Sequence, residues 1–320
     1  MQPEFPNFKP IQLEDREMIR ETLWKYQPQT SEWTFTNLFI WRSHYGFQWS
    51  MYKDWLIVLC TSSPNETYAF HPIGPPSRLE VTRRLLDWLR EEKGEKKPCI
   101  KRADQRLIKE IEGSRDLQVK PTREQFDYIY RSDALIRLAG RKYHSKRNHI
   151  NKFLHSYSFT YAALNKDHLE ASLELSGLWC EVRRCEEDLN LLGEWEAVRE
   201  ALTHFHALSI QGGVILMQNK VEAFALGELL NDQTAVVHVE KANPEIPGLY
   251  TMINQQFCEK SWQNVPSINR EQDLGEPGLR QAKLSYYPDH LVEKFRIQLA
   301  DSPENPAIFR SFQDAVQSKL

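Results

Sequence analysis

The sequence TAVVHVEKANPEIPGLY, residues 234–250, contains the clearest strand-to-helix transition in the chain. Its run of Val236, Val237 and Val239 predicts a strand buried in a sheet. Glu240 and Lys241 then end the strand, and a polar turn leads to a helix that opens near Gly248. A strand and helix joined in this way indicate an α/β protein, with charged groups at the end of a buried strand.

The elements on either side of this transition repeat one order in both halves of the chain. Each half reads as a strand, two helices, three strands, a helix, a strand, a helix and one or two closing strands. In the second half the expected ranges are 159–163, 167–187, 194–209, 212–219, 221–230, 234–242, 248–262, 267–271, 276–286 and 291–300. This order matches the N-acetyltransferase-like (GNAT) superfamily, in which the fourth and fifth strands run parallel and then diverge around the donor group. We therefore expect an α/β (α+β) fold of two tandem GNAT-like lobes, each a mixed sheet flanked by helices.

The length of 320 residues also favours two lobes, because it exceeds what a single ordinary core accommodates. We expect an N-terminal lobe over 1–131 and a basic helical connector over 132–156. The C-terminal lobe would span 157–320 and carry the active site. A short packing helix is expected after Pro306.

Composition narrows the class of protein. The 41 basic and 44 acidic residues give a net charge of −3, so nothing global indicates a dedicated nucleic-acid binder. Five cysteines without a C-x-x-C pair argue against a disulfide framework and against a zinc site, and predict reduced thiols and no metal. No signal peptide and no transmembrane segment are expected. Together these features predict a cytoplasmic protein.

Two segments place charge at the ends of the fourth and fifth strands. In the first, Glu240 could bind an amine or act as a general base, and the following helix offers free backbone N–H groups to an oxyanion or phosphate. The second is SINREQDLGEPGLRQAKLSYYP, residues 267–288, which turns from apolar Ile268 to a fully polar run. Charge at the end of a buried strand costs desolvation unless partners are present. The alternatives are an exposed strand end and a capped, solvated loop.

A third segment, GRKYHSKRNHINKFL at 140–154, is basic and has no acidic residue. Lys142, Lys146 and Arg147 could face the cleft between the lobes and hold phosphates. Cations without acidic neighbours are the usual footprint for RNA or lipid headgroups. The alternative is a solvated basic helix.

These segments, with SEWTFTNLFIWRSHYG at 31–46, resemble a bacterial family of uncharacterised proteins that shares its fold with the C-terminal catalytic domain of phosphatidylglycerol lysyltransferases. The resemblance runs from Phe8 to about Pro288. It is carried by Ser31, Phe35, Asn37, Leu38, Trp41, Arg42, Gly140, Tyr143, Lys146, Arg147, Asn148, Phe153, Glu240, Lys241, Gly248, Tyr250, Asn269, Arg270, Glu271, Asp273, Leu274, Gly275, Gly278, Leu279, Arg280, Lys283, Ser285, Tyr286 and Pro288.

The resemblance implies a tandem GNAT fold like that of the lysyltransferases and of the Fem-type aminoacyltransferases. Those relatives move an aminoacyl group from a charged tRNA to an amine or hydroxyl. Acetyl-CoA-dependent GNAT enzymes have a glycine-rich pyrophosphate loop after the fourth strand, where this chain has NPEIPGLY with the single Gly248. An aminoacyl-tRNA donor is therefore favoured over acyl-CoA, and no other cofactor is expected.

We accordingly expect an acyl- or aminoacyltransferase acting on a small-molecule, peptide or lipid-headgroup acceptor, with tRNA as a partner. The expected catalytic residues are Glu240, Glu271 and Asp273. The expected substrate-binding residues are Lys142, Tyr143, Lys146, Arg147, Asn148, Lys241, Tyr250, Asn269, Arg270, Arg280, Lys283 and Tyr286. The alternatives are a non-catalytic binding module for a nucleotide, tRNA or acidic metabolite, and an acetyl-CoA-dependent N-acetyltransferase.

Overall fold

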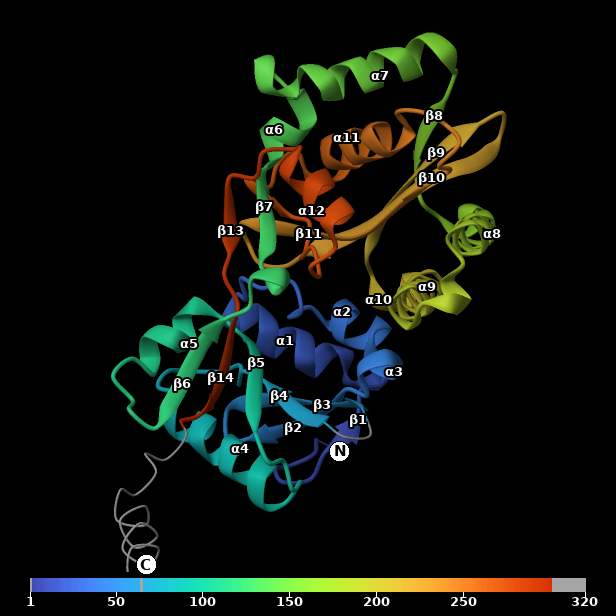
Figure 1. Cartoon of the computed structure of the whole chain (residues 1–320). Helices are drawn as coiled ribbons and strands as arrows, with labels where there is room; N and C mark the ends of the chain where they lie inside the picture. The colour runs from blue at the N-terminus through green and yellow to red at the C-terminus, as the bar shows by residue number, and fades with distance from the viewer. Residues whose placement is uncertain (1, 64–65, 301–320) are drawn as a thin grey trace, which may run out of the picture.

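A computed structural model describes residues 2–63 and 66–300, arranged as two lobes that lie one above the other (Figure 1). The helix expected after Pro306 lies outside these residues. Each lobe is built on one seven-stranded sheet flanked by helices.

The first half of the chain contains short elements joined by tight loops. In chain order they are β1 (Lys9–Pro10), η1 (Leu13–Asp15), α1 (Arg16–Tyr26), α2 (Phe35–Ile40), α3 (Arg42–Tyr45), β2 (Gln48–Tyr52), β3 (Trp55–Ser63), β4 (Glu66–Phe70), α4 (Leu79–Glu91), β5 (Cys99–Ala103), α5 (Gln105–Glu110), β6 (Leu117–Pro121), η2 (Arg123–Gln125) and β7 (Asp127–Arg131).

The second half begins with a helical connector and then repeats this order. Its elements are α6 (Ser132–Arg137), η3 (Arg141–Tyr143), α7 (His144–Ser156), β8 (Thr160–Ala163), α8 (Lys166–Arg183), η4 (Cys185–Glu187), α9 (Leu189–Thr203), α10 (Phe205–Leu208), β9 (Gln211–Met217), β10 (Lys220–Leu229), β11 (Thr234–Ala242), α11 (Leu249–Trp262), β12 (Ser267–Asn269), α12 (Pro277–Leu284), β13 (His290–Val292) and β14 (Phe295–Leu299).

The two sheets have corresponding strand orders, β1-β2-β3-β4-β5-β14-β6 and β8-β9-β10-β11-β12-β7-β13. In each, four antiparallel strands lead to one parallel pair, β4 with β5 and β11 with β12. The parallel pairing of β11 with β12 covers only residues 234–236 and 267–269, and β11 continues beyond it to Ala242. This confirms the predicted α/β (α+β) fold of two tandem GNAT-like lobes.

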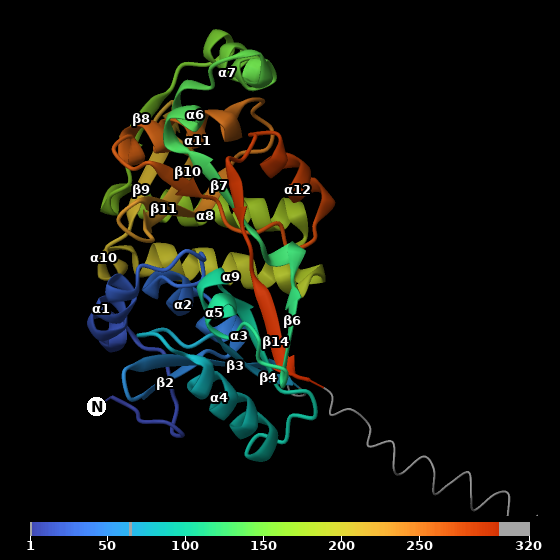
Figure 2. The same ribbon diagram turned by 90° about the vertical axis from the view of Figure 1, so that its left-hand side faces the viewer.

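One strand of each sheet comes from the other half of the chain. β7 pairs with β12 and β13 in the C-terminal sheet, whereas β14 lies between β5 and β6 in the N-terminal sheet (Figures 1 and 2). The single final strand expected over 291–300 was therefore wrong, because its two ends belong to different sheets. The division of the chain at residues 131 and 157 stays a prediction.

The connector is also less regular than one helix. Leu138 has a left-handed backbone (φ 46°) that ends α6, and Gly140 (φ 87°) precedes the turn into α7. Arg147 stabilises this break, since its guanidinium donates to the carbonyls of Leu138 and Gly140 at 2.5 and 2.7 Å. The basic residues Arg141 and Lys142 therefore precede α7 and are not part of its helical face.

The lobes share an apolar core. A single cluster of buried side chains runs from Trp33, Phe35 and Phe39 in the N-terminal lobe to Leu175 and Ala201 on α8 and α9. Beyond this core, Cys180 and Cys185 are joined as a disulfide with Cα atoms 5.2 Å apart, which corrects the expectation of reduced thiols at these two positions. Their spacing of five residues follows no common motif, so the sequence did not reveal the pair.

Candidate functional site

A β-bulge determines which way Glu240 points. On β10, Leu226 pairs with Val239 and Gly227 with Val237, so His238 is an extra residue on β11. An extra residue reverses the alternation of side chains along a strand. As a result Val237 and Glu240 both face α11, and Lys241 faces α8 on the opposite side.

Glu240 and Arg270 meet where β11 and β12 diverge. The carboxylate of Glu240 accepts a short hydrogen bond from Arg270 Nη2 and another from Asn254 Nδ2 at 2.6 Å. Arg270 Nη1 is buried without a hydrogen-bond acceptor among the described residues, and so is Asn254 Oδ1 without a donor. Buried polar groups normally have partners. These two atoms are therefore free to bind a polar ligand.

Tyr286 and two lysines complete this cluster. The Tyr286 ring has Arg270 Cζ 4.8 Å and Lys146 Nζ 3.9 Å from its centroid. Lys283 is buried and donates to the backbone carbonyl of Arg270. Burial and the positive charge of Arg270 lower the pKa of both Lys146 and Lys283 to about 8. The cluster is therefore rich in cations, with Glu240 as its acid.

Glu271 belongs to a second network of hydrogen bonds, which is centred on His238 and is separate from the Glu240 cluster. Its Oε1 lies 2.9 Å from His238 Nδ1 and accepts from Asn37 Nδ2 at 3.2 Å, while His238 Nε2 lies 3.0 Å from Glu228. Burial opposes a charge on this imidazole, yet its two carboxylate partners raise the pKa of His238 to about 9. Glu271 is therefore one of two acids that hold a buried imidazolium.

Asn269 belongs to a third, fully buried group at the crossing of the exchanged strands. Asp127, at the start of β7, accepts from Ser31 N at 2.7 Å, Asn269 Nδ2 at 3.0 Å and Lys294 Nζ at 2.7 Å. Lys294 also donates to Glu32 at 2.6 Å. This group ties Ser31 and Glu32 of the N-terminal lobe to the end of β12.

Asp273 is an anchor for α12. It is fully buried and accepts from Arg280 at 2.8 and 2.9 Å, Arg123 at 3.2 Å and the Tyr128 hydroxyl at 2.6 Å. Although burial favours the neutral acid, the hydrogen bonds from Arg280 and Tyr128 hold the pKa of Asp273 well below its usual range. A carboxylate held in this way is a poor general base.

The remaining predicted residues lie in two places. Lys241 Nζ is 3.1 Å from the Trp179 ring centroid and 2.6 Å from Glu194, and Trp179 donates to the Tyr250 hydroxyl at 3.1 Å. This group is on the α8 side of β11, away from Glu240.

The other place is the connector. The hydroxyl of buried Tyr143 donates to the carbonyl of Tyr286 at 3.0 Å. Lys142 lies 5.4 Å from the Tyr287 ring centroid, and Asn148 contacts His144 on the exposed surface of α7. Gly248 packs against this helix: at its φ of 88°, a Cβ atom would lie 2.5 Å from the His149 carbonyl oxygen.

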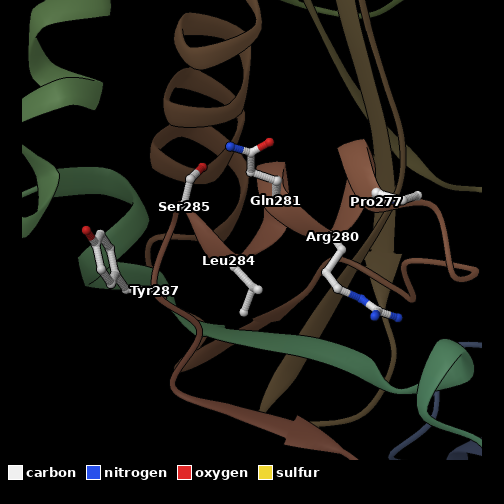
Figure 3. A pocket seen from close by; sticks show the side chains of 6 residues that line it. All are labelled: Pro277, Arg280, Gln281, Leu284, Ser285 and Tyr287. Carbon is white, nitrogen blue, oxygen red and sulfur yellow. The ribbon is translucent and has the colours of Figure 1, made fainter.

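An open pocket of about 520 Å³ lies on α12 and the residues directly after it. Figure 3 shows the side chains that line it. Arg280 is the only one of the predicted site residues that lines it, with Pro277, Gln281, Leu284, Ser285 and Tyr287. The pocket therefore adjoins the Glu240 cluster without containing it.

The structure thus brings together five of the predicted residues, Glu240, Arg270, Lys283, Tyr286 and Lys146, and distributes the others among the neighbouring groups. Sequence reasoning missed His238 and Asn254. The signal for His238 was a polar residue inside the otherwise apolar run VVHV. Asn254 had no comparable signal, because one amide in an amphipathic helix is ordinary.

Comparisons with known proteins agree with this architecture. The family model described as phosphatidylglycerol lysyltransferase, C-terminal, matches residues 25–298. The crystal structure of a conserved protein of unknown function from Bacteroides thetaiotaomicron is 33% identical, with a TM-score of 0.85 over 92% of this chain and 99% of that one.

Two more distant structures share the fold. L-PGS from Bacillus licheniformis is 11% identical, with a TM-score of 0.64 over 96% of each chain. FemX is 11% identical, with a TM-score of 0.52 over 94% of this chain and 99% of that one.

An uncharacterized protein of Mycoplasmoides gallisepticum is 20% identical over 175 residues, which are 54% of this chain and 56% of that protein. The match therefore spans little more than half the length of that relative. Across the described part of this chain, no helix has the length and apolar character needed to cross a bilayer.

Proposed function

The chain belongs to the phosphatidylglycerol lysyltransferase C-terminal family, and we propose that it is an aminoacyltransferase whose donor, an aminoacyl-tRNA, binds where β11 and β12 diverge. The observation that carries this proposal is the largely buried Glu240–Arg270 pair, flanked by Arg270 Nη1 and Asn254 Oδ1, which have no hydrogen-bond partner among the described residues. Open α/β sheets bind ligands at the carboxyl ends of their strands, where this pair lies.

Glu240, Asn254 and Arg270 each have a chemical task in such a transfer. Glu240 and Asn254 Oδ1 would accept hydrogen bonds from the ammonium group of the donor amino acid. The free N–H of Arg270 would stabilise the oxyanion that develops when the ester carbonyl is attacked. Ester aminolysis needs no covalent intermediate, so positioning and oxyanion stabilisation could carry most of the rate.

Four other predicted residues have supporting roles in this proposal. Arg280 and Lys142, at the exposed rim beside α12, would contact phosphate groups of the tRNA. Asp273 and Glu271 would hold the rim and the β12 loop, respectively, through the contacts described above. The acceptor would be an amine or hydroxyl of a small molecule, peptide or lipid headgroup, and we expect the reaction to take place in the cytoplasm.

The test is the decay of radiolabelled aminoacyl-tRNAs, one amino acid at a time, with the purified full-length chain and a mixture of amine and hydroxyl acceptors. We expect one or a few of them to lose their label faster than in buffer. Glu240→Gln and Arg270→Lys should reduce that acceleration by about 100-fold or more, the loss typical for one oxyanion donor. Glu259→Gln, an exposed acid on α11, is the matched control.

Unchanged decay of every aminoacyl-tRNA would refute the donor assignment. One observation favours a second candidate, a binding module: both oxygens of Glu240 already have partners without a ligand. Calorimetric titration with uncharged tRNA and nucleotides separates the two, because tight binding without any turnover would identify the module.

A further inference from the structure

Lys146 is the cation of the Glu240 cluster whose ammonium has neither an ion pair nor a hydrogen bond among the described residues, whereas Lys283 donates to the carbonyl of Arg270. It extends from α7, partly buried, and its Nζ lies 3.9 Å from the centroid of the Tyr286 ring. Among the described residues, no carboxylate lies within ion-pair distance of that nitrogen and no hydrogen-bond acceptor contacts it. The neighbouring cation is Arg270, whose guanidinium lies over the same Tyr286 ring.

The acids around the cluster are all bound to cations or amides. Glu240 is held by Arg270 and Asn254, Glu271 by His238 and Asn37, and Asp273 by Arg280, Arg123 and Tyr128. These contacts engage oxygens of all three carboxylates, and those on Asp273 hold its pKa well below its usual range. A proton released during aminoacyl transfer therefore needs another acceptor.

The surroundings of Lys146 favour its neutral amine. Burial and the positive charge of Arg270 lower its pKa to about 8, so a useful fraction is unprotonated near neutral pH. Lys283 has a similarly lowered pKa, but it is buried and its ammonium donates to the carbonyl of Arg270. The two other groups facing Lys146 are the Arg270 guanidinium, which stays charged, and the Tyr286 phenol, whose pKa is raised by burial.

We propose that Lys146 is the general base and acid of the aminoacyl transfer, an inference that rests on the proposed function. The acceptor's nitrogen or oxygen forms a bond to the ester carbonyl carbon, and its proton moves to the neutral Nζ of Lys146. When the tetrahedral intermediate collapses, the bond from that carbon to the ribose oxygen breaks. The Lys146 ammonium returns the proton to the leaving oxygen, so the amine is neutral again and no proton is gained or lost.

One test measures the amine directly and needs no activity. The full-length protein is labelled briefly with trace acetic anhydride between pH 6 and 10, and acetylation of each lysine is quantified by mass spectrometry against an added lysine peptide. We expect the labelling of Lys146 to be half-maximal near pH 8, well below the peptide, whose amine has a pKa of about 10.4. Labelling of Lys146 in step with the peptide would overturn the proposal.

The second test follows decay of the aminoacyl-tRNA that the wild-type chain accelerates, with water as acceptor, between pH 6 and 9 and corrected for spontaneous hydrolysis. Lys146→Arg keeps the positive charge, but a guanidinium does not give up its proton in this range. We expect the acceleration to fall by about 100-fold, the lower end of the usual contribution of general acid–base catalysis, and its rise with pH around 8 to disappear.

Lys260→Met, which removes an exposed lysine of α11, is the control and should keep the wild-type profile. If Lys146→Arg keeps both the rate and the pH profile, Lys146 serves only as a charge and the base assignment is wrong, while the proposed function stands. If the wild-type chain accelerates no aminoacyl-tRNA, the proposed function fails and the labelling midpoint alone decides whether Lys146 is an available base.

Discussion

The buried imidazole of His238 should make the stability of the folded protein depend on pH. It lies between Glu228 and Glu271, with only 3% of its side chain exposed, and these acids raise its pKa to about 9 despite burial. A histidine whose pKa is raised by folding contributes its full stability below the unfolded pKa of about 6.5 and loses it as the pH rises through the folded value. For a shift of this size the contribution is on the order of 3 kcal/mol.

We therefore expect His238→Gln to lower the free energy of unfolding by about 3 kcal/mol at pH 6 and by clearly less at pH 9.5. Urea unfolding of both proteins at several pH values measures this difference. Lys146 and Lys283 titrate in both proteins, so their effects cancel. His155→Gln, on the exposed surface of α7, is the control. A difference that stays constant with pH would mean that His238 is not charged in the folded protein.

Strands β11 and β12 could largely be predicted from the sequence, but the bulge in β11, where it pairs with β10, could not. The apolar run 235–239 and the polar run after Ile268 correctly predicted two strands whose ends carry the charged cluster. Simple alternation across His238 would have put Glu240 on the same face as Val236 and His238. The bulge reverses this, and only the pairing of β11 with β10 reveals it. The position of the charged cluster could therefore be predicted from sequence, but not the directions of its side chains, and its role as the functional site stays a prediction.

Gly227 allows this bulge to form. A Cβ atom at Gly227 would lie 2.5 Å from the Val236 carbonyl oxygen and 3.3 Å from the Phe257 ring. We expect Gly227→Ala to lower the free energy of unfolding by about 1–3 kcal/mol, the usual cost of overpacking, when measured by urea unfolding. Gly278→Ala is the opposite case, because no atom lies within 4 Å of its Cβ position on α12. It should be neutral or stabilise by up to about 1 kcal/mol. If Gly227→Ala leaves the free energy of unfolding unchanged, the strands can shift enough to accommodate a methyl group.

At the scale of the whole molecule, the exchange of β7 and β14 makes each sheet depend on both halves of the chain. The sequence order predicted two similar lobes, because the periodicity of each element is local. It could not predict the exchange, since strand pairing between distant segments leaves no local pattern. The polar residues at the crossing did not indicate the exchange either. Asp and Lys side chains are usually exposed, but Asp127 and Lys294 are fully buried here. Joined in this way, the lobes should unfold as one cooperative unit.

Lys294 is the residue with which to test this unit, because its ammonium bonds to Asp127 and to Glu32 of the N-terminal lobe. Lys294→Met leaves buried Asp127 without its cation and removes one of the two cations beside Glu32, where Arg102 remains at 3.5 Å. Breaking a buried ion pair in this way typically costs about 3–5 kcal/mol. We expect hydrogen exchange of the most protected amides in β3 and in β10 to report the same decrease in the free energy of unfolding, because neither sheet can stay folded without the other. Lys120→Met changes an exposed residue of β6 beside β14. It should alter the free energies reported by β3 and by β10 by less than about 0.5 kcal/mol each. If protection falls in one sheet only, the lobes unfold separately and the exchanged strands do not couple them.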